Sequence, residues 1–281
     1  MKIHAIYFSA TGGTRRVVDA IVKGINETDQ FTKAEICTHD FTLPQVRETI
    51  PHISSSDIAV VGTPVYAGRV PNLLLKYLQR LQGDGCMAIP IVTYGNRNFD
   101  DALLELHNLL KECNFRPIAA GAFVAQHSFS DILAAGRPNI EDLEQAYNLG
   151  QQAAKKRCSE SFSQREIENG ENPLNIPGRS AVERKYFQPK DSHGNPLDIR
   201  KVKPKTSEKC NRCGHCAAIC PMGAIDTNNP QDVTGICIKC NACIKECTQN
   251  AKYFDDAGYL YHKEDLELKY GEKREAPKIF L

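Results

Sequence analysis

Eight of the twelve cysteines lie in two runs between residues 210 and 247. The first run, "CNRCGHCAAIC", begins at Cys210, and its repeat, "CIKCNACIKEC", begins at Cys237. Cysteines in a small secreted protein would suggest disulfides, whereas a clustered repeat with short, regular spacing is typical of metal ligation in a reducing compartment. The sequence therefore predicts a cytoplasmic protein whose C-terminal region folds around bound metal.

The spacing C-x2-C-x2-C-x3-C resembles that of the bacterial two-cluster ferredoxins, and Pro221 after the first run fits the same pattern. Thr248 stands where the second run would usually have its proline. The resemblance implies two [4Fe-4S] clusters, because in that family the fourth cysteine of each run binds the other run's cluster. The implied ligands are Cys210, Cys213, Cys216 and Cys247 for one cluster, and Cys237, Cys240, Cys243 and Cys220 for the second. Zinc is the alternative, although structural zinc sites usually pair C-x2-C motifs across a longer loop.

The first 157 residues alternate between strand-like and helix-like patterns. Near-continuous apolar runs at 3–8, 57–62, 86–93 and 116–125, with a weaker one at 33–38, predict strands buried on both faces of a parallel sheet. Helical periods at 14–26, 71–82, 99–113 and 140–157 lie between or after them. The expected fold is therefore a doubly wound α/β domain. Pro90 falls inside an expected central strand, where it cannot donate a ladder hydrogen bond, so we expect a bulge or an irregular pairing there.

The stretch "YFSATGGTRR" follows the first expected strand and precedes the first helix. It lacks the lysine of a Walker loop and the glycine spacing of a dinucleotide fingerprint. The hydroxyls of Ser9, Thr11 and Thr14, around Gly12 and Gly13, can still bind a phosphate together with the free N–H groups of the helix. "SATGGT" resembles the flavodoxin phosphate loop, which implies FMN and the strand order 2-1-3-4-5. The alternative is an ordinary capped strand–helix turn.

In that strand order, the third and fourth strands end beside the phosphate loop. The segments "GTPVYAGRVP" and "TYGNRNFDDAL" resemble the flavodoxin loops that flank the isoalloxazine ring. Tyr66 is the expected stacking residue, because an aromatic face can cover the flavin ring. The full set of ring-site residues that the resemblance implies is Thr63, Pro64, Val65, Tyr66, Gly68, Thr93, Tyr94, Gly95, Asn96 and Phe99.

Three charged or titratable residues near these loops have two interpretations each. Arg69 and Arg97 would either stabilise an anionic reduced flavin or face the solvent, where they could dock a partner. His127 follows the fifth expected strand, and an ordinary loop hydrogen bond is favoured over an approach to the flavin edge.

Three regions follow from these patterns. They are a flavodoxin-like FMN-binding domain (1–157), a linker rich in proline, glycine and charge (158–206), and a small α+β ferredoxin-like domain (207–281). The N-terminal apolar stretch is too short for a signal peptide or a membrane span. The net charge of +1 gives no indication of a nucleic-acid-binding surface.

The whole chain resembles the flavodoxin-ferredoxin fusion proteins, which are associated with anaerobic bacteria. The resemblance implies electron transfer between FMN and the clusters, linking a low-potential donor to an acceptor enzyme through redox protein partners. A flavin-dependent reductase of a small substrate, such as a quinone, and a redox sensor are the alternatives. No catalytic acid–base pair or nicotinamide-binding fingerprint is evident, which favours the carrier. A head-to-tail homodimer would let the flavin of one molecule meet the clusters of another.

Overall fold

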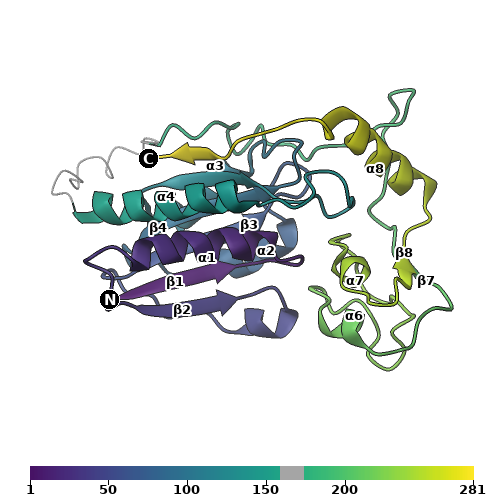
Figure 1. The fold of residues 1–281 in the computed structure, drawn as a ribbon, viewed down its shortest axis with the longest axis horizontal. Helices are drawn as coiled ribbons and strands as arrows, with labels where there is room; N and C mark the ends of the chain where they lie inside the picture. Colours follow the sequence, from purple (N-terminus) through teal and green to yellow (C-terminus); the bar gives the residue numbers. More distant parts are fainter. Residues whose placement is uncertain (159–173) are drawn as a thin grey trace.

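The computed structural model describes residues 1–158 and 174–281. Its main sheet contains the parallel strands β1 (Lys2–Tyr7), β2 (Glu35–Asp40), β3 (Ile58–Pro64), β4 (Met87–Tyr94), β5 (Arg116–Pro117) and β6 (Ala120–Val124) (Figure 1). The strand order β2-β1-β3-β4-β6 confirms the predicted 2-1-3-4-5 order, with β6 as the fifth position. Strand β9 (Lys278–Phe280) pairs antiparallel with β6 and extends the sheet.

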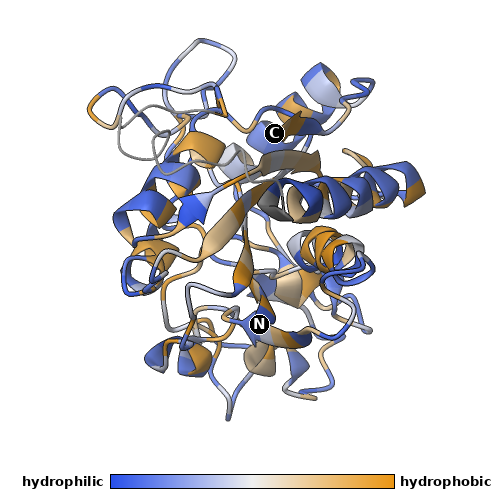
Figure 2. Cartoon of the chain, turned by 90° about the vertical axis from the view of Figure 1, so that its left-hand side faces the viewer, coloured by the Kyte–Doolittle hydropathy of each residue, from blue (hydrophilic) through white to orange (hydrophobic). Residues whose placement is uncertain are grey.

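Helices cover both faces of this sheet, as a doubly wound fold requires. Helices α1 (Gly13–Asn26) and α4 (Ile140–Cys158) bury one face, whereas α2 (Asn72–Leu78) and α3 (Ala102–Glu112) bury the other. A short 3-10 helix, η1 (Pro44–Glu48), follows β2. The central strands are largely hydrophobic and the helices carry hydrophilic stretches (Figure 2). No helix in 1–158 or 174–281 has the length and apolar composition needed to cross a membrane.

Pro90 produces the predicted irregularity on one side of β4 only. Pairing with β3 is continuous through Val61 and Pro90. On the other side, Ala88 is opposite Pro117 and Ile91 is opposite Gly121, so the 116–124 segment has one extra residue between these pairs. The missing N–H is therefore accommodated by a bulge that splits the fifth strand into β5 and β6.

The cysteine-rich region lies beyond the carboxyl ends of the parallel strands (Figure 1). It contains the antiparallel pair β7 (Lys205–Thr206) and β8 (Lys252–Tyr253), and the short helices α6 (His215–Ala218) and α7 (Ala242–Lys245). The longer helix α8 (Ala257–Tyr270) follows, and the chain then returns to β9 in the main sheet. This small α+β arrangement agrees with the predicted fold class.

The limits 1–157, 158–206 and 207–281 stay a prediction, but the described residues add two facts about them. Leu174 and Ile176, from the expected linker, are buried in the core of the N-terminal domain. The end of the expected ferredoxin-like region contributes β9 to the N-terminal sheet. The linker therefore packs against the first domain in part, and the chain crosses between the two regions more than once.

Candidate functional site

The loop between β1 and α1 has the geometry of an anion-binding turn. Gly12 has φ 82°, a left-handed conformation that glycine adopts without strain, and α1 begins at the next residue. The Ser9 hydroxyl accepts a hydrogen bond from the Arg15 N–H at 3.0 Å. The Thr14 hydroxyl lies 2.7 Å from that of Thr93, which links this loop to the end of β4. Free N–H groups at the start of α1 and hydroxyls therefore meet in one loop.

This loop opens into a cavity of about 930 Å³. Most of the residues predicted for FMN line it, and they come from the carboxyl ends of three strands. They are Ser9, Thr11, Gly13, Thr14, Pro64, Val65, Tyr66, Gly68, Thr93, Tyr94 and Gly95. The strand order thus brings together residues that are far apart in the sequence, as it does at the switch point of other doubly wound sheets.

Four of the predicted residues, Gly12, Thr63, Asn96 and Phe99, are not part of the cavity lining. Thr63 is fully buried, and Phe99 packs against Tyr94 with ring centroids 5.7 Å apart. Asn96 is also buried, and its amide donates to the Tyr270 carbonyl at 2.8 Å and to the Lys273 carbonyl at 3.0 Å. The structure therefore gives the Asn96 amide partners in the C-terminal segment, where the sequence predicted the flavin ring.

Tyr66 lies in a tight turn between β3 and α2. Its backbone N–H and carbonyl both bond to Arg69, at 3.0 and 3.1 Å. Gly68 has φ 78°, and a Cβ there would lie 2.4 Å from a carboxylate oxygen of Asp100. Burial raises the pKa of Tyr66 well above its usual range, and the nearby thiols of Cys240 and Cys237 act in the same direction. Tyr66 therefore lies near the second cysteine run and lines the cavity together with Cys237 and Cys240.

Arg69 and Arg97, the two arginines of the expected flavin-side loops, both have side-chain partners in the protein. Arg69 donates through Nε to Glu105 at 2.7 Å, and its guanidinium carbon lies 5.1 Å from the ring centroid of Tyr186. Arg97 pairs with Asp100 and lines the cavity. The side chains of Arg69 and Arg97 are only 14% and 17% exposed. Both arginines are therefore held by a carboxylate, Arg69 by Glu105 and Arg97 by Asp100, and of the two Arg97 lines the cavity.

Part of the cavity wall comes from residues that the sequence pattern did not indicate. They are Tyr186, Phe187, Gln188, Pro189 and 196–200 from the expected linker, with His262 and Leu266 from α8. The Phe187 N–H donates to the Ala67 carbonyl at 2.8 Å, which anchors this segment on the turn that holds Tyr66. The adjacent aromatic pair at 186–187, in an otherwise polar linker, was the available signal.

His127 both makes the expected loop hydrogen bond and lines the cavity. Its Nδ1 accepts from the Phe129 N–H at 3.1 Å. Burial lowers the pKa of His127 to about 3, and the charges of His262 and Lys245 act in the same direction. A neutral imidazole that accepts at Nδ1 carries its proton on Nε2.

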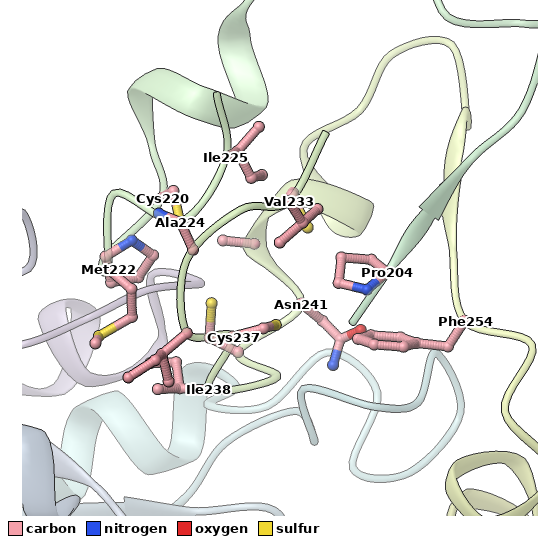
Figure 3. Close-up of a pocket in the computed structure, with 15 residues that line it drawn as sticks. Pro204, Cys220, Met222, Ala224, Ile225, Val233, Cys237, Ile238, Asn241 and Phe254 are labelled. Carbon is pink, nitrogen blue, oxygen red and sulfur yellow. The ribbon is translucent and has the colours of Figure 1, made fainter. Parts of the chain in front are cut away.

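A second, smaller pocket contains all four cysteines predicted for one cluster: Cys220, Cys237, Cys240 and Cys243. Figure 3 labels Cys220 and Cys237 among the residues that line it. Apolar side chains fill the rest of its wall, among them Met222, Ile225, Val233, Ile238 and Phe254. Backbone N–H groups donate to the Cys220 sulfur at 3.3 Å and to the Cys237 sulfur at 3.4 Å. Burial raises the pKa of the Cys240 thiol to about 12, so the free thiol stays protonated at neutral pH.

The two cysteine runs share a backbone conformation. Arg212 and Lys239, at equivalent positions, both have φ 58°, and the left-handed Gly214 and Asn241 precede α6 and α7. The last cysteine of each run accepts a backbone N–H at 3.3 Å, from Ala224 to Cys220 and from Ala251 to Cys247. The sequence repeat is therefore also a structural repeat.

The other predicted ligand set, Cys210, Cys213, Cys216 and Cys247, lies nearer the surface. Cys213 is exposed, and the other three are partly exposed. Burial raises the pKa of Cys216, and the thiols of Cys210 and Cys213 contribute to the shift, which places these three near one another. Among the described residues, no three His, Cys, Asp or Glu side chains are placed to hold one metal ion. A cubane requires a different arrangement, because each of its cysteine ligands binds a separate iron.

Comparison with protein families finds one matching family model in each of the two regions. The family model described as NADPH-dependent FMN reductase matches residues 1–130, and the model described as 4Fe-4S binding domain matches residues 204–226. The chain is a fusion of a flavodoxin-like domain and a 4Fe-4S domain. The fusion protein is thus a flavoprotein of electron transport with an iron–sulfur domain.

Several solved structures resemble the fusion protein at low sequence identity. A flavodoxin from the domain Archaea is 17% identical over 57% of this chain and 100% of its own, with a TM-score of 0.40. The Streptococcus pneumonia TIGR4 flavodoxin is 17% identical over 55% of this chain and 99% of its own, with a TM-score of 0.36. A mutant Fusobacterium nucleatum flavodoxin bound to flavin mononucleotide is 13% identical over 56% and 96%, with a TM-score of 0.37. No curated protein matches the fusion protein.

The large cavity and the cysteine pocket of the fusion protein share a wall. Cys237, Ile238 and Cys240 line both spaces. Lys239, between them, lines the cavity and donates through Nζ to the Cys237 carbonyl at 2.9 Å. Only one stretch of the second cysteine run therefore separates the predicted flavin site from the predicted ligands of one cluster.

Proposed function

We propose that the fusion protein transfers electrons, within one chain, between FMN in the large cavity and a [4Fe-4S] cluster bound by Cys220, Cys237, Cys240 and Cys243. The observation that carries this proposal is the wall that both spaces share, formed by Cys237, Ile238 and Cys240. FMN supplies two-electron chemistry and a cubane supplies one-electron chemistry. Because electron tunnelling weakens steeply with distance, two sites on either side of one wall can exchange electrons without a domain movement.

The cavity residues fit FMN in both charge and shape. Ser9, Thr11 and Thr14 offer hydroxyl groups, and the start of α1 offers N–H groups and the positive end of its dipole, which together suit a phosphate. Tyr66 offers an aromatic face, and Thr93, Tyr94 and Gly95 line the same cavity at the end of β4. A volume of about 930 Å³ lies within the range of cofactor sites.

The cysteine pocket suits a cubane through its ligands and its surroundings, and because the space open in it is only about 20 Å³, cluster binding requires the four cysteine side chains to move apart. Four sulfurs and apolar side chains line it, and backbone N–H groups point to two of the sulfurs, as they do around many iron–sulfur clusters. We assign a second cluster to Cys210, Cys213, Cys216 and Cys247 because the two runs share their spacing and backbone conformation. The exposed Cys213 makes this outer cluster the contact point for redox protein partners.

Contacts between the two regions support transfer within one chain. Lys245 donates through Nζ to the Ser130 carbonyl at 2.9 Å and to the Asp131 carboxylate at 3.0 Å. Arg47 donates to the Pro221 carbonyl at 2.8 Å, and β9 pairs with β6. Lys245 lies in the second cysteine run and Pro221 directly follows the first, so these contacts hold both runs against the flavodoxin-like domain, and neither a diffusional encounter nor a head-to-tail dimer is needed.

Serine substitutions at the two ligand sets test the assignment. The cluster bound by Cys220, Cys237, Cys240 and Cys243 is the inner cluster. Cys240→Ser should remove it and slow flavin reduction by the remaining cluster at least about 100-fold. Cys213→Ser is the matched control, because it should remove only the outer cluster and leave transfer from the inner cluster at the original rate. The measurement is flavin absorbance after rapid reduction of the clusters, with iron content determined for each variant. Slow flavin reduction in Cys213→Ser with a normal rate in Cys240→Ser would contradict the proposal.

A further inference from the structure

Lys252, on β8 of the small α+β region, is a buried lysine. It is only 4% exposed, whereas Lys205, on the paired strand β7, has a side chain that is 61% exposed and forms an ion pair with Asp255. Among the residues that the structure describes, no carboxylate pairs with Lys252. Because burying an ammonium group without an anion is costly, we expect a group of opposite charge beside Lys252 in the protein that holds its cofactors.

Two oxygen atoms fix the direction of the Lys252 side chain. Its Nζ donates to the Pro230 carbonyl at 2.6 Å and to the Thr206 hydroxyl at 2.7 Å. The Thr206 hydroxyl gives its own hydrogen to the Gln231 carbonyl at 3.1 Å, so it accepts from Lys252. Distances this short are typical of hydrogen bonds from a charged donor. An ammonium group has three N–H groups, and the described residues accept two of them, which leaves one for an anionic acceptor.

The Pro230 carbonyl also brings Lys252 close to the first cysteine run. The Cys216 thiol donates to this carbonyl at 3.9 Å. The helices that carry Cys216 and Cys243, α6 and α7, pack against each other, and α7 also packs against β8 (Figure 1). Burial raises the pKa of both thiols, and the Lys252 charge opposes that shift at each. Lys252 therefore lies near one cysteine of each predicted ligand set.

We propose that Lys252 is the buried counter-ion of both predicted clusters and that its charge raises their reduction potentials. A cubane held by four thiolates is a net anion, and each one-electron reduction by an external donor adds one negative charge. A fixed positive charge in a buried site stabilises the reduced form more than the oxidised form. Because one ammonium group serves both ligand sets, the two potentials should move together when it is removed. The inference rests on the proposed function, which assigns the clusters to these cysteines.

Lys252→Met tests the charge, because methionine keeps the unbranched shape without the ammonium group. The full-length protein, loaded with FMN and iron–sulfur clusters, is titrated anaerobically with dithionite and followed by electron paramagnetic resonance. At a fixed potential, the ratio of reduced to oxidised cluster should fall about tenfold at both one-electron steps. A tenfold change corresponds to a reduction potential about 59 mV lower. Lys252 does not line the large cavity, so the flavin potentials should change less.

Two further variants separate the charge from a structural role. Lys205→Met is the matched control, because it makes the same change on the adjacent strand at an exposed lysine that Asp255 already pairs. The ratio of reduced to oxidised cluster should then change less than about twofold. Lys252→Arg keeps the positive charge and should retain the original potentials.

Three results would overturn the inference alone, each in protein that contains about eight iron atoms per chain. They are unchanged potentials in Lys252→Met, a shift confined to one of the two steps, and an equal shift in Lys205→Met. Where Lys252→Met assembles no clusters, Lys252→Arg decides: full iron content with the original potentials supports the inference, and loss of iron in this variant too overturns it. Failure of the unsubstituted protein to assemble clusters would overturn the proposed function as well, so iron content distinguishes the two failures.

Discussion

Replacing Asn96 with aspartate removes two hydrogen bonds that join the flavodoxin-like domain to the C-terminal segment. The amide donates to the Tyr270 carbonyl at 2.8 Å and to the Lys273 carbonyl at 3.0 Å. Aspartate has the same shape and also tolerates the left-handed conformation of this position, where φ is 66°. The substitution therefore changes donors into acceptors with little effect on the backbone.

The cost of Asn96→Asp follows from the bonds lost. Two neutral hydrogen bonds contribute about 1 kcal/mol each, and a carboxylate facing two carbonyl oxygens adds repulsion, for a total of about 2–3 kcal/mol. A change of 2 kcal/mol lowers the ratio of docked to undocked C-terminal segment roughly 30-fold. Because the Asn96 side chain is buried outside the cavity lining, FMN affinity should change less than about twofold.

Two measurements on Asn96→Asp separate docking from flavin binding. Hydrogen exchange at the amides of residues 271–281 should accelerate about 30-fold, while an FMN titration followed by flavin fluorescence should be nearly unchanged. Asn114→Asp is the matched control, because Asn114 has the same left-handed conformation (φ 59°), is exposed and does not line the cavity. A tenfold or greater loss of FMN affinity in Asn96→Asp, with unchanged exchange at 271–281, would refute the reasoning and place Asn96 at the flavin.

Three further predictions concern the cofactors and the buried histidine. Anaerobically prepared protein should contain about eight iron atoms and eight acid-labile sulfides per chain, the content of two cubanes, and stoichiometric zinc without sulfide would contradict the cluster assignment. FMN should bind much more tightly than riboflavin, because the phosphate is what the Ser9 loop recognises. Thr14→Val should lower FMN affinity about tenfold through the loss of a hydrogen bond, whereas Thr32→Val, at an exposed position, should not; equal affinities for FMN and riboflavin would exclude the phosphate site. The folded-state pKa of His127 is depressed to about 3, so the unfolded chain binds more protons between about pH 6.5 and pH 3, and stability falls as the pH drops through this window. At pH 5 the loss is about 2 kcal/mol, and thermal unfolding should show a smaller loss between pH 7 and pH 5 in His127→Leu; identical pH dependence in the two proteins would indicate that His127 is solvated.

The sequence predicts the main sheet well because its strands are buried on both faces. Continuous apolar runs such as 57–62 and 86–93 are the direct consequence of that burial, and they correspond to β3 and β4. Strand β9 could not be predicted, because a three-residue strand has no periodic pattern and depends on a distant partner, β6. Residues 79–82, expected in a helix, lie beyond α2, which ends at Leu78.

Parts of the candidate site are likewise determined by local sequence, and other parts by the packing of segments that are distant in the sequence. The phosphate loop and the Tyr66 turn are recognisable because their residues follow strands directly, so local sequence determines where they lie. The wall formed by Phe187 and His262 depends on how the linker and α8 pack against the first domain; the aromatic pair at 186–187 indicates a buried contact but not its partner. Asn96 illustrates the limit, since its loop is correctly placed, while the partners of its amide are 174 and 177 residues away.

The central claim is that electrons pass between the flavin and the inner cluster within one molecule. Stopped-flow reduction of the clusters, with flavin absorbance followed at several protein dilutions, tests it most directly. The wall shared by the cavity and the cysteine pocket predicts a rate of flavin reduction that does not depend on protein concentration. A tether alone would hold the domains at an effective concentration on the order of millimolar, and direct packing should exceed this. A rate proportional to protein concentration would show that the flavin of one molecule meets the clusters of another, and it would contradict the account.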